Sequence, residues 1–358
     1  MQNLNEKVWI DKKIPEIFEH IQRGKRLKKS DHVLGKIPYV SSTANNNGVD
    51  NYIKKIPGTR AFSNCISLAN SGSVGVAFYE PFYYIASDHV TALKKEGFTV
   101  LQYLFLTSVI KKQKVNFNFN REISDKRISN MRILLPVADN GEPNYKYMEQ
   151  YAATIREKKL SRYRKYIQNY IKELGDYIEI PSLDEKQWKA FVIDRLFDSI
   201  IPGKISNVSQ FIKDNNGSIE YIAATNRNNG VLYFLQENEQ LTNNLQNGNC
   251  IGFIKDGDGS AGYAIYKQEK FVSTVNVLYG YATWLNKYTG LFFVTAQDKI
   301  KDKYGHGYKR NKKHLKSDKI MLPITNNGEP DFKYMEQYSK NMMLRKYKQY
   351  LTFLDIQN

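Results

Sequence analysis

Short, mostly apolar runs separated by polar residues recur over two long stretches of the chain, a pattern typical of β-strands. The runs are rich in β-branched and aromatic residues, and clusters of Asn, Gly, Ser and Asp separate them, as turns require. They cover residues 37–40, 65–69, 74–79, 219–223 and 263–266. Together with a helix expected over residues 99–112, they predict two mostly β globules, at about residues 1–140 and 185–327.

Behind each globule the apolar positions are spaced by three and four residues, which is the heptad seam of a coiled-coil helix. The seam positions are Tyr151, Ile155, Leu160, Tyr163, Ile167, Tyr170 and Leu174 in the first helix and Tyr338, Met342, Tyr347, Leu351 and Leu354 in the second. A helix over residues 144–177 would be about 50 Å long, too long for the core of one globule to cover. We therefore expect the two helices to pack on each other as an antiparallel coiled coil, although two separate amphipathic helices on their own globules would also give this pattern.

The second half of the chain repeats the first. IPYVSSTANNNGV at residues 37–49 matches IEYIAATNRNNGV at 219–231, and ISNMRILLPVADNGEPNYKYMEQY at 128–151 matches LKSDKIMLPITNNGEPDFKYMEQY at 315–338 without a gap. This similarity indicates duplication of one module, and an antiparallel helix pair would relate the two copies by a pseudo-twofold axis. The predicted fold class is α+β, with globules at residues 1–143 and 181–330, a central helix at 144–180 and a C-terminal helix at 331–358.

The charge of the chain favours a polyanionic partner. It has 53 Lys and Arg against 36 Asp and Glu, a formal net charge of +17, and nucleic acid is the first partner expected for such an excess. No apolar run has the length of a signal peptide or of the about 18 residues that a membrane span needs, so we expect a soluble cytoplasmic protein without membrane contact. Cys65 and Cys250 occupy equivalent places in the two copies, and we expect both to be reduced core residues.

Motifs for catalysis and cofactor binding are missing from the sequence. The Gly-Lys pairs at residues 24–25 and 203–204 lack the leading glycine and the hydroxyl residue of a phosphate-binding loop, and no Asn/Asp-Pro-Pro-Tyr or dinucleotide fingerprint occurs. The five histidines do not cluster with the cysteines at zinc spacing. Asp256-Gly257-Asp258-Gly259 resembles a calcium loop, but Lys267 stands where the twelfth-position Glu belongs, so a hairpin turn is expected. The sequence predicts no metal, no cofactor and no catalytic residue in this chain.

Basic residues concentrate in corresponding segments of both copies, at residues 111–127 and 299–316, where they mix with aromatic residues and Asn. Lys and Arg supply the phosphate contacts that dominate affinity for nucleic acid, although a single basic run can also be an ordinary solvated face. With a further cluster around residues 23–29, the candidate contacts are Arg23, Lys25, Arg26, Lys112, Lys114, Asn118 and Arg121 in the first copy and His306, Tyr308, Lys309, Arg310 and Lys312 in the second.

Asn-rich loops at residues 43–48 and 225–230 and Gly-rich loops at 69–75 and 255–262 carry the candidates for base contact. Many of the Asn residues could simply shape the loops, because Asn tolerates left-handed backbone. The tips differ between the copies: Asn45 stands where Arg227 does, and this predicts that the copies read two different sequences. The candidates are Thr43, Asn45, Asn46, Ser71 and Ser73 in the first copy and Thr225, Asn226, Arg227, Asn228, Lys255, Asp256 and Ser260 in the second.

Two other functions fit parts of the sequence. Asp139 with Glu157-Lys158-Lys159 matches a loose nuclease pattern, but Asn326 replaces the aspartate in the second copy and Glu157 lies in the predicted coil. A non-enzymatic RNA-binding or architectural protein would share the charge and the aromatic residues.

The whole chain resembles a known family. Two β-rich domains, each closed by LLPVADNGEPNYKYMEQY or IMLPITNNGEPDFKYMEQY and followed by a long helix, are similar to the specificity (S) subunit of type I restriction-modification systems, and the NGEP-containing variety looks especially like S subunits of type IIB systems. IPYVSSTANNNGV and ANSGSVG are similar to elements of the target recognition domains of that family. The C-terminal helix is shorter than the central one, which departs from the family pattern.

The resemblance implies a function. Each target recognition domain would read one half of an asymmetric, bipartite site on double-stranded DNA, and the coiled coil would set the unread spacer between the halves. Partner subunits, either a methyltransferase (M) or a fused methyltransferase-nuclease, would dock on the outer coil surface at Arg156, Lys158, Arg162 and Arg164. Those partners would use S-adenosylmethionine and Mg²⁺, and in a type I system a motor (R) subunit would use ATP. This chain would direct methylation and cleavage without being an enzyme.

Overall fold

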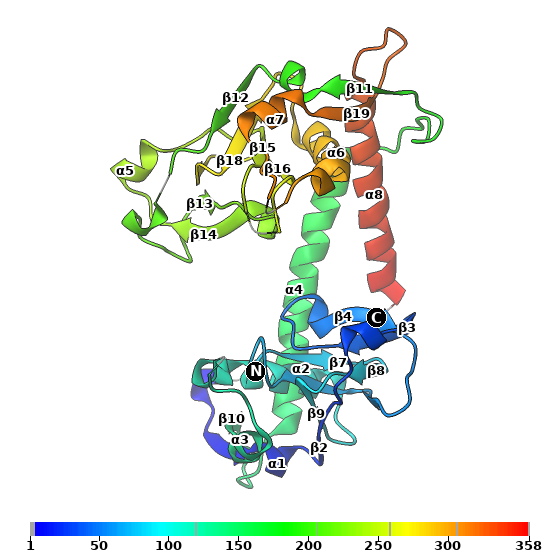
Figure 1. Ribbon diagram of the computed structural model, residues 1–358. Coiled ribbons are helices and arrows are strands. Elements are labelled where there is room, and N and C mark those ends of the chain that lie inside the picture. Colours follow the sequence, from blue (N-terminus) through cyan, green and yellow to red (C-terminus); the bar gives the residue numbers. More distant parts are fainter. Residues whose placement is uncertain (1–3, 119, 206, 258, 306, 357–358) are drawn as a thin grey trace. The chain divides into compact units, whose positions relative to one another are not determined.

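The computed structural model describes residues 4–118, 120–205, 207–257, 259–305 and 307–356 (Figure 1). The chain divides into two compact units between Lys165 and Tyr166, within one long helix. Each unit has its own hydrophobic core.

The first unit contains three small sheets. A two-stranded antiparallel sheet closes the globule, with strands β1 (Trp9–Lys13) and β10 (Arg132–Pro136). A four-stranded antiparallel sheet has the order β2 (His20–Arg23), β9 (Val90–Lys94), β6 (Cys65–Ala69) and β7 (Ala77–Glu80). A mixed sheet, in which β3 and β8 are parallel, has the order β4 (Val49–Ile53), β3 (Leu34–Val40), β8 (Tyr84–Ala86) and β5 (Arg60–Phe62). Its helices are α1 (Ile14–Ile17), α2 (Val100–Lys112) and α3 (Asp125–Asn130).

The second unit repeats this topology. The closing sheet pairs β11 (Trp188–Val192) with β19 (Lys319–Pro323). The antiparallel sheet has the order β12 (Ser199–Pro202), β18 (Val277–Tyr281), β15 (Cys250–Ile254) and β16 (Ala264–Lys267). The mixed sheet has the order β14 (Val231–Leu235), β13 (Ile219–Ile222) and β17 (Phe271–Ser273), again with one parallel pair, and a single Gln246–Phe271 bridge stands in place of β5. Its helices are α5 (Glu239–Thr242), α6 (Lys287–Gln297) and α7 (Lys312–Ser317).

Equivalent residues make equivalent contacts in the two units, so the duplication inferred from sequence is confirmed. The Trp9 indole N–H donates to the Leu4 carbonyl at 3.2 Å, and the Trp188 indole does the same to Leu183 at 2.9 Å. In each unit the strand with the cysteine follows a left-handed Asn whose side chain accepts a hydrogen bond from a tyrosine hydroxyl. These bonds join Tyr79 to Asn64 at 2.7 Å and Tyr266 to Asn249 at 2.8 Å.

Burial along the closing strands follows strand geometry. In β10, Ile133 and Leu135 are buried and Leu134 between them is exposed, as strand geometry requires. Cys65 and Cys250 are fully buried, which confirms the prediction that they are core residues. The predicted strand at residues 74–79 is displaced, because β7 starts at Ala77 and residues 74–76 belong to the turn that ends the Gly-rich loop.

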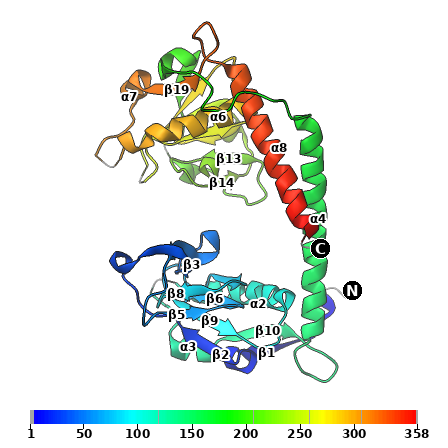
Figure 2. The same ribbon diagram turned by 90° about the vertical axis from the view of Figure 1, so that its right-hand side faces the viewer.

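A long helix follows each globule, α4 (Tyr145–Leu174) and α8 (Phe332–Ile356). In the second unit α8 lies next to the last turns of α4 (Figure 2). The Tyr170 and Tyr347 rings are 6.0 Å apart, and the Asn341 side chain bonds to both main-chain polar groups of Ile178, at 2.6 and 3.3 Å. Of the predicted seam, Ile167, Leu174 and Leu354 are buried, Ile155, Leu160, Tyr170, Met342, Tyr347 and Leu351 are half-buried, and Tyr163 departs from the pattern with 42% exposure.

The first seam position of each helix is a correction to the sequence prediction. Tyr151 packs on the first core, with its ring 5.9 Å from that of Phe105, and Tyr338 lies 5.6 Å from Phe292 of the second unit. The reason is that the first turns of each helix close the globule that precedes them, as the complete burial of Met148 and Met335 shows. Within the described ranges, no helix is long and apolar enough to cross a membrane.

The two units place opposite charges at one buried position. Glu80 pairs with Cys65 across β6 and β7, and Lys267 pairs with Cys250 across β15 and β16. The Lys267 ammonium forms an ion pair with Glu220. The Glu80 carboxyl accepts a hydrogen bond from the Ser67 hydroxyl at 2.8 Å, while its Oε2 has no partner among the described residues. Burial raises the pKa of Glu80 to about 7, against the opposing effect of the Ser67 bond.

We expect Glu80→Gln to stabilise the first unit at high pH. The folded carboxyl holds its proton more tightly than the unfolded one, so its contribution to stability is complete below the ordinary glutamate pKa of 4.5 and is lost as pH rises through about 7. Glutamine cannot ionise, and the variant should gain about 3 kcal/mol of unfolding free energy at pH 8, with the gain shrinking towards pH 4.5. Denaturant unfolding at several pH values, with the exposed Glu157→Gln as charge control, measures it. A gain independent of pH would contradict this account.

Candidate nucleic-acid interface

Three loops come together in the first unit, where strand β6 ends. They are residues 41–48, the Gly-rich segment 70–75 and the basic segment 113–123. The Ser73 amide donates to the Ser42 carbonyl at 3.1 Å, and the Ile123 amide donates to the Asn70 carbonyl at 2.9 Å. These main-chain bonds hold the segments that sequence analysis selected as one surface.

The second unit brings the corresponding three loops together at the end of β15. The Asn226 amide donates to the Ser260 hydroxyl at 3.2 Å, which joins the Asn-rich loop to the Gly-rich loop. The Arg310 amide donates to the Lys255 carbonyl at 2.9 Å, as Ile123 does to Asn70 in the first unit. Thr225, Asn226, Arg227, Gly259 and Ser260 line a hollow at the meeting point.

The Asn-rich loops have the same backbone in both units. Asn46, Asn47 and Gly48 have φ of 48°, 51° and 80°, and Asn228, Asn229 and Gly230 have φ of 47°, 50° and 80°. Three successive left-handed residues suit Asn and Gly and few other residue types, which confirms that these Asn residues shape the loop. The Asn46 and Asn228 side chains remain exposed, so contact with DNA remains open to them.

Glycine is required where the Gly-rich loops approach the Asn-rich loops. A Cβ on Gly257 would lie 2.2 Å from the Ala224 carbonyl oxygen, which belongs to the backbone and cannot move aside easily. A Cβ on Gly72 would lie 2.5 Å from the Ser42 hydroxyl. The sequence pattern of Gly-rich loops therefore reflects close packing of two loops.

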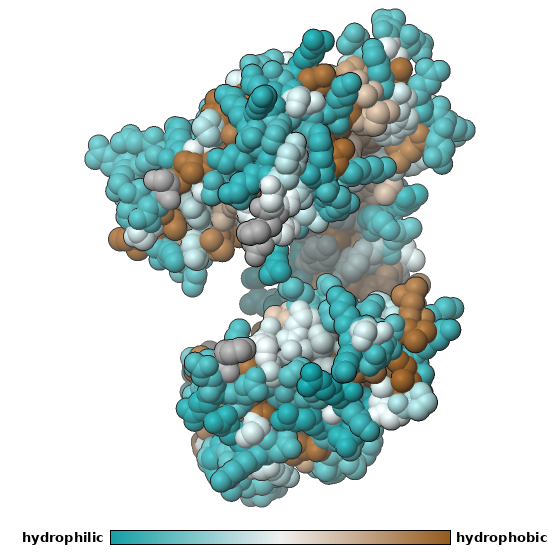
Figure 3. All heavy atoms as spheres, viewed as in Figure 1, coloured by the Kyte–Doolittle hydropathy of each residue, from teal (hydrophilic) through white to brown (hydrophobic). Residues whose placement is uncertain are grey.

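Several predicted contact residues have cations open to solvent. Lys25, Arg26, Lys112, Lys114 and Arg121 in the first unit and Arg227 and Lys312 in the second are exposed, and none of them forms an ion pair with another described residue. The face of the molecule in Figure 3 is mostly hydrophilic over both units. Such cations are available to phosphate groups.

Other predicted contact residues are engaged in the fold. Arg23 pairs with Asp125 at 3.1 Å and donates to the Ile123 carbonyl at 3.3 Å. Lys309 pairs with Asp256 at 2.7 Å across two loops. The Lys255 ammonium donates to the Val275 carbonyl at 3.1 Å. A polyanion would have to compete with these partners or bind beside them.

Hydroxyl and amide side chains at the loop tips also bond locally. Thr43 and Thr225 each accept a hydrogen bond, at 3.2 Å, from the amide of the residue two positions on, Asn45 or Arg227. Asn118 accepts one from the Asn120 amide at 3.0 Å. Ser73 is half-buried. His306 and Asp258 lie outside the described residues.

Ser71 and Ser260 are corrections to the predicted contacts. Ser71 is buried and donates to the Glu122 carboxylate at 2.5 Å, and Ser260 is buried and donates to the Asn226 side chain at 3.2 Å. Both hydroxyls form hydrogen bonds that join two loops. The close approach of the loops excludes solvent from these hydroxyls. Sequence analysis did not select Glu122 as a partner.

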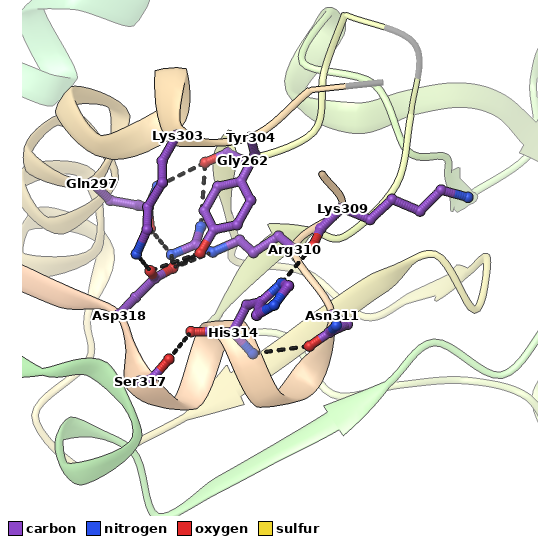
Figure 4. A network of polar contacts seen from close by, with 10 residues as sticks. All are labelled: Gly262, Gln297, Lys303, Tyr304, Lys309, Arg310, Asn311, His314, Ser317 and Asp318. Atoms are coloured by element: carbon purple, nitrogen blue, oxygen red, sulfur yellow. Dashed lines mark hydrogen bonds and ion pairs between the residues drawn. The ribbon is translucent and has the colours of Figure 1, made fainter. Parts of the chain in front are cut away.

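Arg310 is the clearest correction, because its side chain is fully buried and cannot reach DNA (Figure 4). It forms an ion pair with Asp318 at 2.9 Å and donates to the Gln297 side chain at 2.5 Å. The Tyr304 hydroxyl donates to the same Asp318 carboxylate at 2.7 Å, and burial raises the pKa of that tyrosine, so the proton stays in place. The neighbours of Arg310 in the sequence are basic, and this composition led to its prediction as a DNA contact.

Tyr308 keeps an exposed face, with 48% of its surface accessible. Its ring stacks on His314 at 4.6 Å and on Tyr304 at 5.7 Å, which orders the loop between α6 and α7. The ring is therefore held at the tip of a basic loop, beside Lys309.

A nuclease centre at Asp139 and Glu157 has no structural support. Asp139 lies in the turn before α4, whereas Glu157 lies twelve residues beyond the start of that helix at Tyr145, a rise of about 18 Å. In the part of the chain that the structure describes, no three His, Cys, Asp or Glu residues are grouped so that they could hold a metal ion.

Comparison with known proteins identifies one family. Residues 6–162 and 177–350 match the family described as Type I restriction modification DNA specificity domain. The Type II restriction enzyme BgcI specificity subunit S.BcgI of Heyndrickxia coagulans is 28% identical over 312 residues, which cover 85% of this chain and 85% of the relative. The crystal structure of a type I restriction-modification system S subunit from M. genitalium has the same fold, with a TM-score of 0.50 and 15% identity over 99% of this chain and 95% of that chain. Because the family match covers most of both halves, this chain belongs to the type I restriction-modification DNA specificity domain family.

Proposed function

We propose that this chain, as the DNA specificity subunit of a restriction-modification system, reads one half of a bipartite asymmetric site on double-stranded DNA with each of its two units. One observation carries the proposal: the same three-loop surface occurs in both units with different side chains at the tips. Asn45 and Arg227 occupy one such exposed position, and Ala44 and Asn226 occupy the one before it. A shared scaffold with unequal tips suits two unequal half-sites.

Exposed cations and loop-tip residues have different roles in binding: the cations contact phosphate groups and the tip residues contact bases. Lys25, Arg26, Lys112, Lys114 and Lys312 suit phosphate contacts, which fix position and carry no sequence information. Arg227 suits a base contact, because it is exposed at the edge of a hollow and its planar fork of donors can bond the O6 and N7 atoms of guanine. The net charge of +17 adds long-range attraction to the double helix.

Partner subunits supply the chemistry in this proposal. A methyltransferase, or a fused methyltransferase-nuclease, docks on the exposed cations Arg156, Lys158 and Arg162 of α4 and on the adjoining Arg164, and uses S-adenosylmethionine and Mg²⁺. In a type I assembly a motor subunit uses ATP as well. The chain itself contributes recognition and no catalytic group.

The long helices form an antiparallel coiled coil that sets the spacer between the half-sites. Support comes from the contacts of the second unit, where Tyr170 meets Tyr347 and the later Ile178 meets the earlier Asn341. The helix α4 has 30 residues, a length of about 45 Å. One turn of DNA measures about 34 Å, so half-sites somewhat more than one turn apart fit this ruler.

Methylome sequencing of cells that contain the chain and its partner methyltransferase tests the proposed function. We expect one methylated motif with two unequal specific parts separated by an unread spacer. The partner without this chain is the control and should leave that motif unmethylated. A continuous motif, or the same motif in the control, would contradict the proposal.

Substitution of Arg227 tests base contact in the second unit. We expect Arg227→Ala to lose about 1–3 kcal/mol of discrimination at one base pair of one half-site, measured by competition binding to duplexes with single base changes. Asn45→Ala, at the equivalent place in the first unit, is the matched variant and should affect the other half-site only. Equal weakening on every sequence would instead identify Arg227 as a phosphate contact.

Shortening both helices tests the ruler. Removal of seven residues from the exposed middle of α4 and seven from α8 preserves the heptad phase and shortens the pair by about 10 Å. The preferred spacer should then shorten by about three base pairs, with both specific parts of the motif retained. The methylome of the shortened variant reports the spacer directly, and an unchanged spacer would show that the helices do not set it.

A further inference from the structure

One buried cluster of four side chains has a different chemical character in the two units. In the first unit it is filled by the apolar residues Ile110, Phe117, Ile123 and Met131. In the second unit it is filled by a polar set with the same places in the fold: Gln297, Tyr304, Arg310 and Asp318.

Main-chain bonds establish the equivalence. The amides of Ile123 and Arg310 donate to Asn70 and Lys255, each at 2.9 Å, where β6 and β15 end. The carbonyls of Met131 and Asp318 accept from Ile14 and Ile193, each at 2.9 Å. Phe117 and Tyr304 each bond to a lysine three residues earlier, and Ile110 and Gln297 are each the eleventh residue of α2 and α6.

The polar set is a connected network, and the exposed Lys303 reaches it from outside with an ammonium that donates to Asp318 at 2.8 Å (Figure 4). The Arg310 guanidinium bonds to Asp318, to Gln297 and, at 3.2 Å, to the carbonyl of Gly262. The Gln297 amide donates to the same Gly262 carbonyl at 2.8 Å. The guanidinium also lies over the Phe253 ring, 5.1 Å from its centroid. Each donor group of the arginine thus has a partner inside the core.

Stability does not require this network. A buried ion pair loses much of its attraction to the cost of desolvation, and well-packed apolar residues at the same place are often as good or better. The first unit shows that apolar residues can fill this position in the same scaffold. The polar set adds directional hydrogen bonds, and these hold the main-chain groups to which they bond in one position.

The network holds both ends of the Gly-rich loop and the base of the basic loop that contains Tyr308 and Lys309. Lys255 and Gly262, whose carbonyls bond to Arg310, flank the tip of the Gly-rich loop. Arg310 itself directly follows Tyr308 and Lys309. At the outer end, Lys309 pairs with Asp256 of the Gly-rich loop. The two loops are therefore joined at the base by the buried network and at the tip by an exposed ion pair.

We propose that Arg310, together with Gln297 and Asp318, is a positioning residue for DNA recognition by the second unit. The network locks the Gly-rich loop and the loop at residues 304–310 into one surface, so that Asp256, Tyr308 and Lys309 meet the second half-site as a set. The first unit joins its corresponding loops without a buried charge, through the Ile123 amide and the Ser71–Glu122 bond. This inference rests on the proposed function and specifies how one of its two half-sites is read.

A quadruple variant transfers the apolar set of the first unit into the second: Gln297→Ile, Tyr304→Phe, Arg310→Ile and Asp318→Met. All side-chain bonds to Gly262 disappear while the position stays filled. We expect the chain to fold with a thermal unfolding midpoint no lower than that of the unchanged protein. Asp194→Asn is the matched control, because it removes an exposed ion pair with Lys316 in the same unit and takes away no basic residue.

The measurement uses the full chain in complex with its methyltransferase partner and duplexes with single base changes across the whole motif. We expect the quadruple variant to lose discrimination in the second half-site by about tenfold or more, with the first half-site read as before. The Asp194→Asn complex should read both half-sites normally. A folded quadruple variant with unchanged discrimination in both half-sites would overturn the inference and reduce the network to core filling.

Two further outcomes are decisive. If the quadruple variant does not fold, Gln297→Met decides, because it removes one bond to Gly262 and one to Arg310 and keeps the ion pair; selective loss in the second half-site supports the inference and unchanged discrimination overturns it. If the unchanged complex reads no bipartite motif at all, the proposed function fails, and the inference fails with it. Failure of the inference alone is recognised by a bipartite motif that every folded variant reads equally well.

Discussion

Irregular loops can read a DNA sequence only if contacts other than regular secondary structure fix their backbone. A mobile loop would lose conformational entropy on binding, and this loss would offset the favourable contacts with DNA. Both units of this chain solve the problem by packing three loops against each other at the end of one buried strand. Left-handed Asn and Gly residues make the close approach possible, and main-chain bonds such as Ile123 to Asn70 and Arg310 to Lys255 hold it. The exposed tips are then free to differ.

Duplication explains how two recognition surfaces can share one architecture and differ in sequence preference. The closing sheet, the four-stranded antiparallel sheet, the positions of α2 and α3 against α6 and α7, and the Trp9 and Trp188 contacts are shared by the two units. Among the differences are the loop tips and two buried places: Glu80 in the first unit corresponds to Lys267 in the second, and an apolar set in the first corresponds to the network around Arg310 in the second. The scaffold thus tolerates large chemical changes inside as well as outside, provided that each buried polar group finds a partner or can be neutral.

Much of the fold could be predicted from the sequence, because runs of β-branched and aromatic residues, helix periodicity and internal repetition each leave a direct pattern. The strand at residues 65–69 and the helix ending at Lys112 were predicted closely. The buried role of Arg310 could not be predicted, since a basic residue in a basic loop is expected at the surface. Its partners Gln297 and Asp318 lie thirteen residues before it and eight residues after it, so no local pattern joins them. Tyr151 and Tyr338 were assigned to the coil because helical spacing is the same whether the apolar face covers a globule or another helix.

The central claim is that one module, present twice, supplies two independent reading surfaces, and that the loops of each module alone choose its half-site. The most direct measurement is the methylome of a chain in which the second globule, residues 181–330, is replaced by a copy of residues 1–143, expressed with the same partner. The account predicts a bipartite motif that contains the first half-site twice, with the original spacer. Retention of the original second half-site would contradict it.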